Sequence, residues 1–232
     1  MISNWRDFWD RPHRIYVNDR HRRVHYAQVA ADILEELPRE PGVVLDSGCG
    51  EALRAADLAA RCKRLILCES APSVLDALRE RYAGTPSIAV IAAGTVTNIP
   101  DGSLDLIVAN SVLQYLTSEE TARLAETLRP KLAPEGRLIF ADVVPPGGGV
   151  VADVSSLLTT AARYGFLLAA LGGLAATFVS DYRRLRQQIG LTTYEEAEIV
   201  GLLEKAGYRA ERRPRNFGFN QRRMTIIARS KR

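Results

Sequence analysis

The sequence predicts an α/β fold: a Rossmann-like, doubly wound sheet of seven strands, mostly parallel, with an antiparallel final strand and a helical insertion after the fifth strand. Three observations support this prediction. Short apolar runs alternate with helical patterns between residues 43 and 144, as in βαβ units. Gly48 and Gly50 follow the first apolar run and allow a tight turn beside a ligand. The last two strand-like segments, 208–214 and 222–230, are close in sequence, which favours an antiparallel pair.

The length of 232 residues suits one domain with a sizeable core. We therefore expect a single domain over residues 1–232, with an N-terminal helical flap over 1–39 and an apolar helical insertion or lid over 145–190. The 31 basic and 27 acidic side chains leave a net charge of +4. This mild excess does not require nucleic acid, and we expect none as a partner. The arginines near both ends form either solvated surface or a surface that attracts an acidic substrate or an anionic membrane.

The three cysteines are Cys49, Cys62 and Cys68, and their spacing is irregular. An odd, irregular set predicts neither a disulfide framework nor a metal site, so we expect reduced thiols. The first residues lack the basic and then apolar pattern of a signal peptide. Together these features favour a cytoplasmic protein, with membrane association as an alternative.

Aromatic side chains are dense at the N-terminus. Trp5 and Trp9 are four residues apart and share one face if the segment is helical. They either pack onto the domain or form a flap over a ligand. Asn18 is a plausible N-cap for a helix over 19–37. The helix has an apolar stripe made by Tyr26, Val29, Ala30, Ile33 and Leu37.

The first predicted strand, 43–46, ends at Asp46 and leads into the glycine turn and a helix over 51–61. The second, 65–69, ends at Glu69. An acidic residue about 20 positions past such a loop can reach a ribose hydroxyl pair. Pro72 suits the first turn of a helix that runs to Tyr82. Further strands are expected over 88–91, over 104–109 and from Arg137 to Val144.

The run Asp46-Ser47-Gly48-Cys49-Gly50 after an apolar strand, followed by Glu69, resembles the first motifs of class I S-adenosylmethionine-dependent methyltransferases. Within that class the chain is similar to the small-molecule group typified by ubiquinone and menaquinone biosynthesis. The resemblance implies S-adenosylmethionine as the cofactor, and Asn110 and Ser111 at the methyl end. The cofactor-binding residues that it implies are Asp46, Ser47, Gly48, Cys49, Gly50, Glu69, Ser70, Gly94, Thr95, Asn110 and Ser111.

Two positions depart from the family pattern. Ala52 stands where a third glycine is usual, and Ala93 stands where an aspartate often accepts from the adenine amino group. Gly94 and Thr95 remain as the expected adenine contacts. No metal site is expected.

Residues 150–180 are strongly apolar, with only Asp153 and Arg163 charged. The uncharged core from Tyr164 to Ser180 is interrupted by Gly172-Gly173 and is shorter than the roughly 20 residues of a membrane span. The segment forms either two helices packed on the domain or a lid over an apolar substrate chamber that touches a membrane surface. Capping boxes at Thr117 with Glu120 and at Thr193 with Glu196 predict helices to Leu132 and over 194–206.

We expect methyl transfer to a small, hydrophobic or lipid-like acceptor, at oxygen or carbon, because an apolar insertion suits such an acceptor. Tyr115 and His25 are the candidates for a catalytic base, and neither is assigned. The alternative is a catalytically silent module that binds S-adenosylmethionine or lipid. A nucleic-acid methyltransferase is disfavoured, because no Asn/Asp-Pro-Pro-Tyr-type motif follows the fourth strand. The sequence leaves the oligomeric state open.

Overall fold

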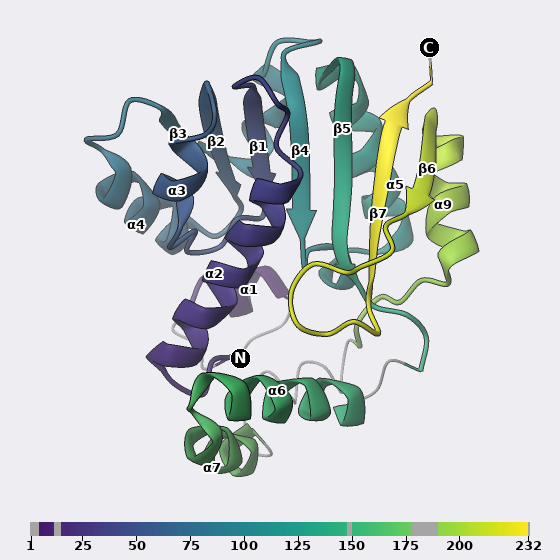
Figure 1. Cartoon of the computed structure of the whole chain (residues 1–232). Helices are drawn as coiled ribbons and strands as arrows, with labels where there is room; N and C mark the ends of the chain where they lie inside the picture. Colours follow the sequence, from purple (N-terminus) through teal and green to yellow (C-terminus); the bar gives the residue numbers. More distant parts are fainter. Residues whose placement is uncertain (1–4, 12–14, 148–149, 178–189, 232) are drawn as a thin grey trace.

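A computed structural model describes residues 5–11, 15–147, 150–177 and 190–231. Its centre is a seven-stranded sheet in the order β3-β2-β1-β4-β5-β7-β6 (Figure 1). The first five strands run parallel, and β7 runs antiparallel to both of its neighbours. This confirms the predicted fold class. The strands are β1 (Val43–Ser47), β2 (Arg64–Glu69), β3 (Ile88–Ala92), β4 (Leu104–Asn110), β5 (Leu132–Val143), β6 (Tyr208–Arg212) and β7 (Met224–Ser230).

Apolar side chains from both faces of the sheet form two layers of core. One layer joins Val44 and Leu67 of the sheet to α2 (Asp19–Glu35), α3 (Ala55–Ala59) and α4 (Pro72–Tyr82). The other joins Leu45, Ile107 and Phe140 to α5 (Ser118–Leu128) and α9 (Glu196–Lys205). Such two-sided burial is typical of a parallel sheet and places the ends of the strands at the edges of the core. Short 3-10 helices lie at η1 (Ala93–Asn98), η2 (Leu113–Tyr115) and η3 (Arg129–Lys131).

The predicted helix starts are confirmed at two places. Asn18 Oδ1 accepts a hydrogen bond from the His21 N–H at 2.9 Å. Thr117 and Glu120 form a reciprocal capping box at the start of α5. Helix α3 is much shorter than the predicted 51–61, because the turn after Gly50 continues to Arg54 before helical hydrogen bonds begin.

The predicted capping box at Thr193 and Glu196 is wrong. The N-cap of α9 is Glu195, which pairs with Glu198. The preceding Tyr194 donates its N–H to the Val144 carbonyl at 2.9 Å and is 3% exposed. This anchor holds the chain extended up to Glu195, so the helix starts two residues later than the sequence pattern indicated.

The described part of the insertion after β5, residues 150–177, forms two helices, α6 (Val150–Tyr164) and α7 (Leu167–Thr177). They lie beyond the carboxyl ends of the parallel strands (Figure 1). The helix break falls at Gly165, with φ of 73°, while Gly172 and Gly173 lie inside α7, contrary to the expected break. Phe166 follows the break and is buried among Ala161 and Ala170. In the described part of the chain, no helix has the length and hydropathy that crossing a bilayer requires.

The first helix, α1 (Trp5–Trp9), packs beside η2 through its aromatic face. The ring centroid of Tyr115 lies 4.7 Å from that of Trp5 and 5.4 Å from that of Trp9. Just after α1, the Asp10 carboxylate accepts from the Ser73 N–H at 2.8 Å at the start of α4. The N-terminal segment therefore contacts both the turn after β4 and the helix after β2.

Candidate functional site

The turn after β1 depends on two glycines with positive φ, 76° at Gly48 and 55° at Gly50. A side chain at Gly48 would meet Val112, because an added Cβ would lie 2.5 Å from Val112 Cγ2. The N–H groups of Gly48 and Cys49 donate to the Cys68 carbonyl at 2.8 and 3.2 Å, so β2 fixes the turn. The turn therefore comes close to the segment after β4, as a small-residue loop allows.

Two carboxylates lie at the ends of the adjacent strands β1 and β2. Glu69 accepts hydrogen bonds from the N–H groups of Gly50, Ser70 and Ala71, at 2.9, 2.6 and 3.1 Å. Asp46 is 9% exposed; burial, and secondly the charge of Glu69, raise its pKa to about 7. Two buried acidic groups side by side favour a ligand that brings positive charge or several donors.

Asn110 and Ser111 stand where β4 ends, next to β1 in the sheet. Asn110 Nδ2 donates to Ser111 Oγ at 3.3 Å, while Asn110 Oδ1 is buried without a hydrogen-bond partner among the described residues. A buried acceptor without a partner costs about 1–3 kcal/mol. A ligand with an N–H or O–H donor at this point would relieve that cost.

The structure adds a charged cluster that the sequence analysis missed. Ser111 Oγ donates to Asp142 Oδ2 at 2.6 Å, and Arg223 Nη1 donates to the same oxygen at 2.5 Å. Arg223 Nη2 also donates to Asp153 at 3.0 Å, and Gln114 Oε1 accepts from Arg223 at 3.3 Å. We call Ser111, Asp142, Asp153 and Arg223 the charged cluster.

Two members of the charged cluster have unusual backbone conformations. Ser111 has φ of 57° and Asp142 has φ of 61°. Non-glycine residues in this region cost of order 1–3 kcal/mol and gather at functional sites. Asp142 lies near the end of β5, just as Glu69 and Asn110 end their strands and Asp46 is the last residue but one of β1. That shared position was the sequence signal that could have identified it.

The two candidate bases lie in different surroundings. Burial lowers the pKa of His25; the Asp142 carboxylate opposes this shift and the Arg223 guanidinium adds to it. His25 is therefore close enough to Asp142 and Arg223 to be affected by their charges, and its lowered pKa leaves it neutral near pH 7. Tyr115 lies instead among the rings of Trp5 and Trp9.

The remaining predicted residues, Ser70, Gly94 and Thr95, lie in two different places. Ser70 lies at the Glu69 carboxylate and donates to it through Oγ at 3.2 Å. Gly94 and Thr95 lie in η1 and are exposed, and the Thr95 hydroxyl donates to the Ala92 carbonyl at 2.8 Å. The strand ends therefore bring the Asp46, Glu69 and Asn110 groups to one edge of the sheet, with η1 following β3 at the same edge.

Comparisons with known proteins agree with this geometry. A protein-family model described as a methyltransferase domain matches residues 45–140, which include the ends of β1, β2 and β4. Trans-aconitate 2-methyltransferase of Methylobacterium radiotolerans is 37% identical over 112 residues, covering 47% of this chain and 41% of that protein. The carboxy-S-adenosyl-L-methionine synthase of Wolinella succinogenes is 30% identical over 122 residues, covering 50% of this chain and 51% of that protein.

These matches therefore span about half or less of each curated relative. Among solved structures, the S-adenosylmethionine-dependent methyltransferase SibL in its apo form superposes with a TM-score of 0.60 at 17% identity. That superposition covers 90% of this chain and 55% of SibL and supports the fold alone. The buried carboxylates, the glycine turn and the unpartnered Asn110 oxygen fit a cofactor with a cationic and a ribose part. Residues 45–140 therefore match a methyltransferase domain, and the chain is similar over this stretch to S-adenosylmethionine-dependent methyltransferases.

Proposed function

We propose that this protein transfers a methyl group from S-adenosylmethionine to a small, hydrophobic or lipid-like acceptor, at oxygen or carbon. The observation that carries the proposal is the placement of Asp46, Glu69 and Asn110 at the ends of the adjacent strands β1, β2 and β4. The carboxyl ends of parallel strands are where this type of fold binds ligands. The proposal also keeps the chain in the small-molecule group suggested by its sequence.

Each strand end has a separate role in the proposal. The bound cofactor supplies an electrophilic methyl group on a sulfonium. Asp46, together with the turn from Ser47 to Gly50, binds the cationic amino-acid part, and Glu69 with Ser70 binds the ribose. Gly94 and Thr95 contact the adenine. Binding and orientation at a site that excludes water account for much of the rate of such displacements.

Asn110 and Ser111 mark the end of the site where the acceptor would bind. Asn110 Oδ1 accepts from the cofactor's ammonium group, which satisfies its buried oxygen. The acceptor lies between the charged cluster and the aromatic side chains around it. His25 and Tyr115 remain the two candidates for a base, and His25 is the better candidate because it is neutral near pH 7 and lies near Asp142 and Arg223.

Aromatic contacts support a hydrophobic acceptor. The ring of His21 stacks on Phe166 at 5.2 Å, and Tyr16 contacts both His21 and His25. These rings join α2 to the insertion beside the charged cluster. A chamber with apolar walls and a few polar groups is typical of small-molecule sites.

Peripheral membrane contact forms part of the proposal. Leu167, Leu168 and Leu171 of α7 are 39%, 86% and 51% exposed, and they lie within one turn of each other. An apolar helix face of this kind can enter the interfacial region of a bilayer. Leu168→Glu should abolish sedimentation with liposomes. Equal sedimentation of the variant and the unaltered protein would overturn the proposed membrane contact.

The central test combines calorimetry with a transfer assay. S-adenosylhomocysteine should bind the full chain, and radiolabelled S-adenosylmethionine should label quinols, phenols or lipid acceptors. Absence of S-adenosylhomocysteine binding at millimolar concentration would overturn the proposal. Binding without transfer to any acceptor would favour the alternative of a silent binding module.

A further inference from the structure

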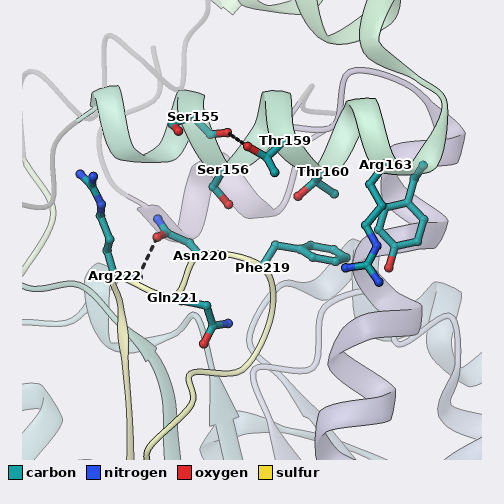
Figure 2. A pocket seen from close by; sticks show the side chains of 10 residues that line it. Ser155, Ser156, Thr159, Thr160, Arg163, Phe219, Asn220, Gln221 and Arg222 are labelled. Atoms are coloured by element: carbon teal, nitrogen blue, oxygen red, sulfur yellow. Dashed lines mark hydrogen bonds between the residues drawn. The ribbon is translucent and has the colours of Figure 1, made fainter.

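A pocket of about 290 Å³ lies between α6 and the loop that joins β6 to β7 (Figure 2). Arg163 of α6 and Arg222 of the loop lie at its two ends. None of the ten described residues that line the pocket is acidic. The pocket therefore presents positive charge without a carboxylate on its wall.

Hydroxyl groups extend the set of donors between the two arginines. Thr159 Oγ1 donates to the Ser155 carbonyl of its own helix at 2.9 Å. Ser156 and Thr160, in contrast, point toward the loop (Figure 2). Guanidinium and hydroxyl donors together suit a phosphate group, because a phosphate has three terminal oxygens that accept hydrogen bonds and a carboxylate has two.

Two rings give the pocket an apolar wall. The ring centroids of Tyr164 and Phe219 lie 5.5 Å apart, and the Arg163 guanidinium lies 5.6 Å from the Tyr164 ring. The pocket has room for an organic body in addition to an anionic group. We propose that it binds a small organic phosphate, with the phosphate at Arg163 and the organic body against Tyr164 and Phe219.

This pocket is separate from the proposed cofactor site but shares a loop with the charged cluster. Asn220 Nδ2 donates to Asp153 at 3.0 Å, and Asp153 accepts from Arg223 at 3.0 Å. Arg223 also pairs with Asp142, so its single positive charge offsets only part of the charge of Asp153, and neither carboxylate lines the pocket. The bound phosphate is therefore a ligand distinct from the one at Asp46 and Glu69.

The test is calorimetric titration of the full chain with phenyl phosphate, with benzyl alcohol as a neutral comparison. Arg163→Gln should weaken phenyl phosphate binding by about tenfold, the loss of one charge-assisted contact, whereas Arg222→Gln, at the opposite end of the pocket, should weaken it less. The matched control is Arg61→Gln, an exposed arginine just before β2, which removes the same charge and should leave the affinity unchanged. S-adenosylhomocysteine affinity should stay the same in all three variants, which shows that they fold.

Equal weakening in all three variants, or none in Arg163→Gln, would overturn the proposal. Vesicles then identify the source of the phosphate. Displacement of phenyl phosphate by phosphatidylglycerol vesicles, and not by phosphatidylcholine vesicles, would identify a lipid headgroup. Retained binding in the presence of both would identify a free organic phosphate. Failure of S-adenosylhomocysteine to bind would overturn only the proposed methyl transfer.

Discussion

The carboxylate of Glu69 accepts a hydrogen bond from the N–H of Gly50 at 2.9 Å, so the end of β2 fixes the turn that follows β1. The same carboxylate accepts from the N–H groups of Ser70 and Ala71. Glu69 therefore positions the loop, and in the proposed function its remaining lone pair binds the ribose. Removing the carboxylate should therefore weaken ligand binding both by releasing the turn and by removing a direct contact.

Glu69→Ala should weaken S-adenosylhomocysteine binding by more than about tenfold, because charged hydrogen bonds to the ligand and to the turn are lost together. Isothermal calorimetry measures the change. Glu80→Ala, at an exposed position on α4, is the matched control and should bind normally. Unchanged affinity in Glu69→Ala would remove the ribose assignment.

Cofactor binding should depend on pH through Asp46, whose pKa burial and the Glu69 charge raise to about 7. A cationic ligand favours the ionised form, so binding releases a proton below pH 7. Affinity should therefore rise as the pH increases toward 7 and level off above it. Asp46→Asn should remove both this dependence and most of the affinity. A flat affinity between pH 5.5 and 8 in the unaltered protein would contradict the assignment.

The same pKa shift carries a consequence for stability. Because the folded pKa of Asp46 lies above its unfolded value, folded protein binds more protons between about pH 4 and pH 7. This contribution lowers the free energy of unfolding as the pH rises through that range. Asp46→Asn should consequently raise the melting temperature at pH 8 and leave it nearly unchanged at pH 4.

The N-terminal segment should slow cofactor release. Asp10 accepts from the Ser73 N–H at 2.8 Å, while Trp5 and Trp9 contact Tyr115. Asp10→Ala should increase the dissociation rate of S-adenosylhomocysteine by about fivefold, as expected for one lost hydrogen bond. Both tryptophans of the chain lie in α1, so stopped-flow fluorescence reports on this segment. An equal rate in Asp10→Ala and in the exposed control Asp76→Ala would argue against a flap.

Replacing Ala52 with glycine should stabilise the folded protein. It has φ of 42°, which is strained for a residue with a Cβ. Ala52→Gly should increase the free energy of unfolding by about 0.5–1 kcal/mol. Ala77→Gly, at an exposed position inside α4, should lower it by about 1 kcal/mol instead. Chemical denaturation measures both, and destabilisation by Ala52→Gly would show that the turn does not carry this strain.

Much of the architecture was predictable because each signal is local. The strand ends at Asp46 and Glu69 were found from short apolar runs, and Asn18 and Thr117 from capping chemistry. The start of α9 could not be predicted in this way, because it depends on the contact of Tyr194 with Val144, and these two residues are distant in sequence. The break between α6 and α7 likewise depends on how Phe166 packs, which the positions of glycines alone do not reveal.

The fold class and the two acidic strand ends follow from the sequence alone, because contiguous residues at fixed spacing encode them. Only the tertiary structure revealed the pairing of Asp142 with Arg223. The antiparallel register of β5 with β7, which pairs Val143 with Met224, brings these two side chains together across the sheet. Non-local pairing of this kind follows from strand order rather than from local sequence. The insertion is similar: its apolar character was evident, whereas the polar pocket beneath α6 depends on which helix face meets the loop before β7.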